Sequence, residues 1–188
     1  MDFGARVQAK NQLALGLGVK NHWRFEARDK DGNVKWIEEF DNLTTTQGLN
    51  DILTKYFSGS AYTAAWYCRL VDNVGFGAFA AADTAAKVTT STPSGGTNNW
   101  QENVGYSNAT SPAIVFGTAS AGSISNSASP AVFNINATVT IYGGFATSTD
   151  TPGGTTGVLY GEGAFSATRS LLNGDTLTVT VTMTAAST

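Results

Sequence analysis

The sequence predicts a mainly β protein: an antiparallel β-sandwich, jelly-roll or Ig-like in topology, with one short helix packed on it and an N-terminal arm. Three observations predict this class. Short runs of alternating apolar and polar residues recur along the chain, turn-forming clusters separate them, and a single segment has helical periodicity. The 188 residues match one ordinary domain in size. We therefore expect an arm or edge strand at 1–20 and a single sandwich domain at 21–188.

The first two strands are expected to form a hairpin at about 21–40. Trp23, Phe25 and Ala27 alternate with charged or polar residues, which is the pattern of a half-buried strand. Asp31-Gly32 follows, and a second run with aromatic and β-branched residues ends at Phe40. An Asp-Gly pair between two such runs favours a tight turn.

One helix is predicted, at about 45–58. Thr44 and Gln47 have the spacing of a capping box, and Gly59 is suited to end the helix. Apolar residues recur at helical spacing, so we expect them to face inward against a sheet. They are Leu49, Ile52, Leu53, Tyr56 and Phe57.

The rest of the chain is predicted to be strands around one long loop at 72–112. The strands are expected at 65–71, 113–117, 131–136, 137–147, 157–166 and 175–184. Within the last, Leu177, Val179, Val181 and Met183 alternate with threonines, so one face should be buried. Gly143-Gly144 inside a strand indicates a bulge or bend.

Charge is scarce and unevenly distributed. The 11 basic and 14 acidic residues give a formal net charge of −3, which argues against nucleic acid as a partner. Between Asn103 and Thr188 only Asp150, Glu162, Arg169 and Asp175 are charged. The second half must therefore present a surface of Ser, Thr, Asn and Gly, or be covered by another protein.

The sequence lacks the residues of most enzyme chemistries. His22 and Cys68 are the only histidine and cysteine, so disulfides and Cys/His zinc sites are excluded. The G-x-G-x-x-A of residues 75–80 lacks the βαβ setting of a dinucleotide site. Glu38 and Glu39 are adjacent on a strand and point to opposite faces, so they cannot act as a pair. We expect no catalytic residue, cofactor or metal.

The N-terminal 20 residues hold a candidate interface. The apolar run 13–19 is far shorter than a membrane span, so no membrane role is expected. It is either the first strand of its own sheet or an arm that adds a strand to a neighbour's sheet. Trp100, in a polar context, is predicted to be exposed and suited to a protein contact. The candidate interface residues are Phe3, Leu13, Leu15, Leu17, Val19, Trp100 and Tyr106.

Several segments together resemble a known family. They are Trp36 to Phe40, Asn42 to Thr45, Gln47 to Asn50, Tyr56-Phe57, Tyr62 to Tyr67, Phe79 to Thr84 and Gly174 to Leu177. With these residues the chain resembles the small virion structural proteins, of the head decoration or cement type, that tailed bacteriophages encode among their head genes. The resemblance spans roughly residues 34–184, and it carries no catalytic residues.

The resemblance implies a non-enzymatic decoration protein on the capsid exterior that is present in the host cytoplasm during assembly. Its partners would be the major capsid protein, whose neighbouring subunits it would bridge and stabilise, and further copies of itself, most plausibly as a trimer. Low charge suits such a role because interfaces are depleted of charged residues. A carbohydrate-binding β-sandwich module and a tail accessory protein are the alternatives. Exposed Trp100 and Tyr106 around a polar hollow would favour carbohydrate binding.

Overall fold

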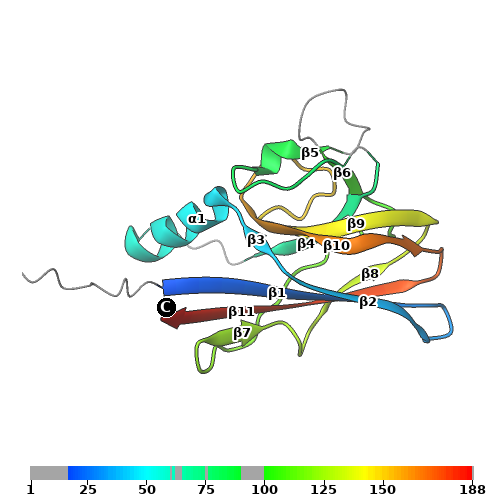
Figure 1. The fold of residues 1–188 in the computed structure, drawn as a ribbon, viewed down its shortest axis with the longest axis horizontal. Helices are drawn as coiled ribbons and strands as arrows, with labels where there is room; N and C mark the ends of the chain where they lie inside the picture. Colours follow the sequence, from blue (N-terminus) through cyan, green and yellow to red (C-terminus); the bar gives the residue numbers. More distant parts are fainter. Residues whose placement is uncertain (1–16, 60, 62–64, 75, 90–99, 188) are drawn as a thin grey trace, which may run out of the picture.

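The computed structural model describes residues 17–59, 61, 65–74, 76–89 and 100–187, which form two sheets packed face to face (Figure 1). The first sheet contains β1 (Leu17–Arg28), β2 (Val34–Asp41), β7 (Ser123–Ser125), β8 (Ala131–Asn134) and β11 (Thr176–Ser187). The second contains β3 (Leu43–Thr44), β4 (Tyr67–Asp72), β5 (Val88–Thr89), β6 (Trp100–Asn103), β9 (Val139–Thr147) and β10 (Leu159–Leu171). This arrangement confirms the predicted antiparallel β-sandwich.

Strand order places the two ends of the described chain side by side. The first sheet runs β2-β1-β11-β7, and β8 also pairs with β11; the second runs β3-β10-β9-β4-β6-β5. All described pairs are antiparallel except the two-residue β5 with β6. Leu17 of β1 lies opposite Ser187 of β11, so both strands begin or end at the same edge of the sandwich.

The predicted hairpin and the predicted last strand are both confirmed. β1 and β2 are joined by a turn in which Gly32 adopts a φ of 85°. The Asp29 carboxylate accepts hydrogen bonds from the backbone N–H groups of Asp31 and Asn33, which closes this turn. Along β11, Leu177 and Val179 are fully buried, as the alternation predicted.

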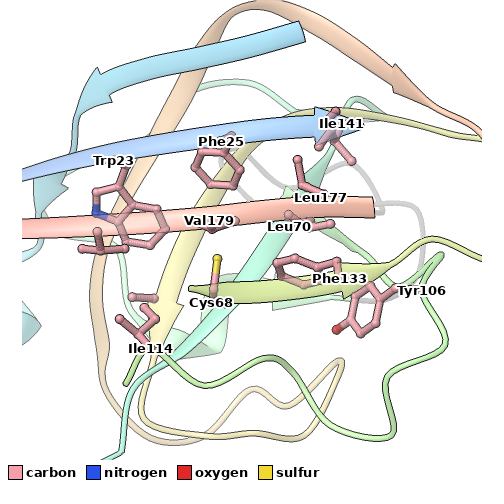
Figure 2. Packing of buried hydrophobic residues seen from close by; sticks show 14 of the residues in the cluster. Trp23, Phe25, Cys68, Leu70, Tyr106, Ile114, Phe133, Ile141, Leu177 and Val179 are labelled. Carbon is pink, nitrogen blue, oxygen red and sulfur yellow. The ribbon is translucent and has the colours of Figure 1, made fainter. Parts of the chain in front are cut away.

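The core between the sheets mixes aromatic and aliphatic side chains from both sheets. Figure 2 shows Phe25 of β1 and Phe133 of β8 beside Cys68, Leu70 and Ile141 of the second sheet. The Phe25 ring stacks on Phe40 and meets Phe165 edge-on. Aromatic pairs in these geometries add about 0.5–1.5 kcal/mol beyond their buried area.

Glycines in β9 and β10 make room for this aromatic layer. A Cβ on Gly144 would lie 2.4 Å from the Phe25 ring, and one on Gly163 would lie 2.1 Å from the Phe40 ring. Beside Gly143, the pairing register of β9 shifts with respect to both neighbouring strands. The predicted irregularity at Gly143-Gly144 is therefore confirmed.

Replacing Gly144 with Ala is expected to lower the free energy of unfolding by about 1–3 kcal/mol, because Phe25 has to move out of a packed position. Gly77→Ala is the matched control, since a Cβ there meets no atom within 4 Å. Urea unfolding followed by tryptophan fluorescence measures both. Equal stability of the Gly144 variant and the parent would contradict the close packing of Phe25 against β9.

A second layer covers the outer face of the six-stranded sheet. The segment predicted as a long loop at 72–112 contains a short 3-10 helix, Ala85–Lys87, as well as β5 and β6. Its apolar side chains form a second cluster with Val71, Phe145 and Leu159. The strand predicted at 113–117 is wrong, because Ala113 makes only an isolated bridge with Tyr67 there.

Candidate functional site

The helix α1 (Thr46–Phe57) has an apolar flank that nothing in the described chain covers. The expectation that its five apolar side chains face a sheet is wrong: Leu53 is 54% exposed, Tyr56 80% and Phe57 70%. Leu49 is also exposed, and only Ile52 is half-buried. The reason is visible in Figure 1, where α1 extends away from the two sheets. We call Leu49, Leu53, Tyr56 and Phe57 the helix flank.

The first turn of α1, by contrast, is held firmly on the second sheet. Gly48 is buried so closely that a Cβ would lie 2.3 Å from the Tyr160 carbonyl oxygen. Thr45 is the N-cap, and its hydroxyl accepts from the Gly48 N–H while it donates to the Leu159 carbonyl. The predicted capping box of Thr44 and Gln47 is therefore wrong, and the N-cap is the next residue, Thr45.

Gln47 does not take part in capping. Its side-chain oxygen accepts hydrogen bonds from the backbone N–H groups of Leu159 and Ala85, and its amide nitrogen donates to the Gly157 carbonyl. At the other end the helix stops where predicted, with Ser58 as C-cap and Gly59 at a φ of 65°. The first turn of α1 is therefore fixed on the second sheet, and the rest of the helix extends away from it.

Two adjoining cavities lie below α1, at the edge where β1 begins and β11 ends. The first, of about 330 Å³, is lined mainly by apolar side chains, and the second, of about 280 Å³, shares Ile124 and Met183 with it. We call them the end cavities. The first is lined by Asp51, Ile52, Lys55, Tyr56, Trp66, Phe116, Ile124, Tyr160 and Met183. Val19 and Ala185 line the second.

The candidate interface residues fall into three groups. Phe3, Leu13 and Leu15 lie outside the described residues. Leu17 and Val19 belong to β1, in register with β11, so the alternative of a strand in the chain's own sheet is confirmed for them. Phe116 and Ile124, which sequence reasoning did not single out, lie with Val19 at the end cavities.

Trp100 and Tyr106 form the third group, and the predicted exposure of Trp100 is wrong. Trp100 is fully buried between Phe79 and Phe145, and Tyr106 is 6% exposed against Phe133. Both rings are covered by this chain itself, because Trp100 belongs to the second apolar cluster and Tyr106 belongs to the core between the sheets. Neither ring is available as an exposed platform for a sugar.

A buried acidic pair lies under the second layer. Glu162 of β10 is fully buried, and its carboxyl group contacts that of Asp83, which is 1% exposed. Burial, and then the negative charge of Asp83, raise the pKa of Glu162 to about 9. Asp83 also accepts from the Ala80 N–H at 3.0 Å and pairs with Lys87 at 3.0 Å.

An ion pair between β4 and β6 is also fully buried, and β9 separates it from Glu162 of β10. Arg69 of β4 donates from Nε to Glu102 of β6 at 2.9 Å, and a second hydrogen bond joins Nη2 to the same carboxylate. The guanidinium lies 5.0 Å from the centre of the Phe145 ring. Phe145 is in register with Arg69 on one side and with Glu162 on the other.

The same ion pair fixes the connection that covers it. Arg69 donates to the Gly154 carbonyl, and Glu102 accepts from the Gly153 N–H at 2.5 Å. The Tyr106 hydroxyl is 3.4 Å from Glu102. Burial, followed by the charge of Glu102, raises the pKa of Tyr106.

The other polar residues considered for chemistry have structural partners. Glu38 is buried and binds Arg169 and Ser166, whereas Glu39 is exposed, which confirms that they point to opposite faces. Asp175 is 4% exposed and pairs with Lys35. His22 is partly exposed beside Asp41, and Cys68 is buried.

No metal-binding cluster is found among the described residues: nowhere do three or more His, Cys, Asp or Glu side chains meet. Residues 76–80, in the G-x-G-x-x-A segment, do not form a helix. Phe76 and Phe79 instead pack on the second apolar cluster. Within the described chain, no helix has the length and apolar character needed to cross a membrane.

Comparison of the sequence with protein-family models and with curated proteins finds no match. A function for this chain therefore has to be inferred from its fold, its exposed surfaces and its side-chain contacts.

Proposed function

We propose that this chain is a non-enzymatic structural subunit of a larger assembly, and that the helix flank is its contact with a partner subunit. The observation that carries this proposal is the exposure of Leu53, Tyr56 and Phe57 on a helix whose first turn is rigidly anchored. Contiguous exposed apolar side chains of this size are typical of protein interaction sites. Aromatic residues are also enriched at the centres of such sites.

The distribution of charge supports the same proposal. Of the four charged residues after Asn103, Glu162 and Asp175 are buried, and Arg169 is paired with Glu38. The part of the surface formed by the second half therefore carries almost no charge. Such a surface can be covered by a partner without the cost of desolvating ions.

In its specific form, the proposal is a virion structural protein on the capsid exterior. It would decorate a phage head and bridge neighbouring major capsid subunits, as a self-associating copy that is most plausibly trimeric. The resemblance to small head proteins of tailed bacteriophages supports this form. A carbohydrate-binding role is weaker, because Trp100 and Tyr106 are buried by the chain itself.

The test is a variant that removes apolar surface from the helix flank without touching the core. Leu53→Ser combined with Phe57→Ser changes two exposed side chains, so the free energy of unfolding should stay within about 1 kcal/mol of the parent. Particles of the phage that encodes the chain are purified, and the chain is quantified by mass spectrometry. The parent is expected in a fixed ratio to the major capsid protein, and the double variant at least tenfold less.

Leu172→Ser is the matched control, since Leu172 is an exposed leucine at 51% beside a turn remote from α1 in the sequence. It should be incorporated like the parent. Absence of the parent chain from purified particles would overturn the virion proposal. Normal incorporation of the double variant would show that the helix flank is not the contact.

A further inference from the structure

A third, smaller cavity adjoins the first end cavity on the side of the core. It has a volume of about 20 Å³ and reaches Trp23 of β1, which is 1% exposed. Four side chains line both cavities: Trp66, Phe116, Tyr160 and Met183. The first end cavity therefore continues inward, from the underside of α1 to a buried tryptophan. We call these two cavities together the Trp23 pocket.

The wall of the Trp23 pocket suits an apolar molecule that contains a ring. The rings of Trp66 and Tyr160, with centroids 5.1 Å apart, contribute aromatic surface to it, as does Phe116. The outer part measures about 330 Å³, about twice the volume of a cavity that accepts benzene. Apolar pockets of this size with a few polar groups are typical of small-molecule sites.

One polar group of the pocket lacks a partner. The indole N–H of Trp23 is buried and donates to no atom of the described residues. Figure 2 shows its nitrogen on the side of the ring nearer the start of β1, which is the end of the sandwich where the end cavities lie. A water molecule needs two to four polar partners, and this wall is largely apolar. The acceptor atom of an apolar ligand suits this donor better.

The charges around the pocket favour a neutral ligand. Asp51 and Lys55, which have opposite charges, both line the outer part, and Lys55 donates to the Ala61 carbonyl. The Tyr160 hydroxyl donates to Asn21, and burial raises the pKa of Tyr160 to about 12, so it stays neutral. An ion that enters the pocket would lose its hydration without a matching countercharge.

We propose that the Trp23 pocket binds a small neutral aromatic carbonyl compound, whose ring contacts Trp66 and Phe116 and whose carbonyl accepts a hydrogen bond from Trp23. An apolar side chain of a partner subunit would fill the outer part but would leave the Trp23 donor without an acceptor. The proposal does not rest on the helix flank, of which only Tyr56 lines the pocket.

Acetophenone and ethylbenzene are suitable probes because they differ at one carbon, which is a carbonyl in the first and a methylene in the second. Each is titrated into the ¹⁵N-labelled full chain. Acetophenone should bind saturably at one site, with a Kd of about 1 mM or lower, and should shift the indole N–H signal of Trp23. Trp100 is the internal control, because its indole N–H also lacks a partner but its ring packs between Phe79 and Phe145. Absence of saturable binding, or an equal shift of the Trp100 signal, would overturn the proposal.

The ratio of the two affinities separates a hydrogen bond from apolar burial alone. Ethylbenzene is the less soluble in water, so a purely apolar cavity would prefer it. With the Trp23 donor, acetophenone should bind at least as tightly as ethylbenzene. In Trp23→Phe, which lacks the donor, the ratio should shift at least tenfold toward ethylbenzene. An unchanged ratio in this variant would overturn the proposal, and so would a preference of the parent for ethylbenzene, which can be measured even if the variant does not fold.

A substitution that fills the outer part of the pocket locates the ligand. Ile124 of β7 lines it, and Ile124→Trp should weaken the binding of acetophenone at least tenfold. Leu172→Trp is the matched control, since it adds the same ring at a leucine that is 51% exposed, and it should bind acetophenone like the parent. Equal affinities of Ile124→Trp and the parent would place the ligand elsewhere and overturn the proposal.

Discussion

Replacing Glu162 with Gln is expected to stabilise the protein above pH 5, by an amount that grows with pH up to about pH 9. The Glu162 carboxyl has a pKa of about 9 in the folded protein, against 4.5 for an ordinary glutamate. Between these values the folded chain holds a proton that the unfolded chain has lost. The free energy of unfolding therefore falls as pH rises, by up to about 1.4 kcal/mol per pH unit.

The groups around Glu162 explain why Gln is the suitable replacement. Asp83 contacts the carboxyl, Lys87 pairs with Asp83, and neither oxygen of an ionised Glu162 has a hydrogen-bond partner of good geometry. A protonated Glu162 can donate to Asp83. The Gln amide can donate in the same way but does not ionise, so the dependence on pH should disappear with little change in packing.

Urea unfolding at pH 5, 7 and 9 measures this effect. The stability of parent and variant should differ least at pH 5 and most at pH 9. Glu39→Gln, which removes a carboxylate from an exposed position, should keep the pH profile of the parent. If the curves for the parent and for Glu162→Gln run parallel across this range, Glu162 does not carry its proton in the folded state.

Acid should destabilise the protein through other carboxylates, so the most stable pH is expected near 5. Although burial raises the pKa of Glu38, the Ser166 N–H and Arg169 together lower it below its usual value. Arg24, against a smaller effect of burial, lowers the pKa of Glu26. A carboxylate with a lowered pKa contributes stability that is lost as pH falls through that pKa. The same urea series extended to pH 3 should show this loss.

Local periodicity was enough to predict the parts of the fold that depend on neighbouring residues. Three such patterns predicted elements that the structure contains. They are the alternation around Trp23 and Phe25, the Asp31-Gly32 turn, and the alternation of apolar residues with threonines in β11. The ends of α1 were also predicted to within a residue or two, because capping and a left-handed Gly59 are local requirements.

Periodicity could not predict which partner an apolar face meets. The spacing of Leu49, Leu53 and Phe57 shows that these side chains share one side of a helix, but the sheet contacts α1 through Gly48, which has no side chain to signal burial. The prediction that Trp100 is exposed was wrong for the converse reason. Its neighbours are polar, yet the segment from Phe76 to Val88 folds over it from a distance in the sequence.

The buried charges were also missed, although the sequence contains a signal for each. Glu162 stands between two glycines in a stretch of strand that is buried on both faces, within a half of the chain that has only four charges. Arg69 interrupts an apolar run of the same kind. A charge inside a strand that has no polar face has to find a buried partner, but the sequence does not say which one.

Removing one partner of the buried ion pair is expected to lower the free energy of unfolding more than replacing both partners. Arg69→Met leaves the Glu102 carboxylate without its cation, and Glu102→Leu leaves the guanidinium without its anion. Each single variant should lower the free energy of unfolding by about 3–5 kcal/mol. The double variant should be more stable than either single one, because an apolar pair needs no desolvation energy and can pack against Phe145 and Trp100.

The double variant should still differ from the parent in the connection around Gly153 and Gly154, which Glu102 and Arg69 hold by hydrogen bonds to the backbone. Hydrogen exchange of residues 150–158 should therefore become faster in all three variants, whereas global stability recovers only in the double one. Urea unfolding supplies the four stabilities of this cycle. Additive losses in the double variant would mean that Arg69 and Glu102 act separately, and that the connection is held by contacts other than their shared charge.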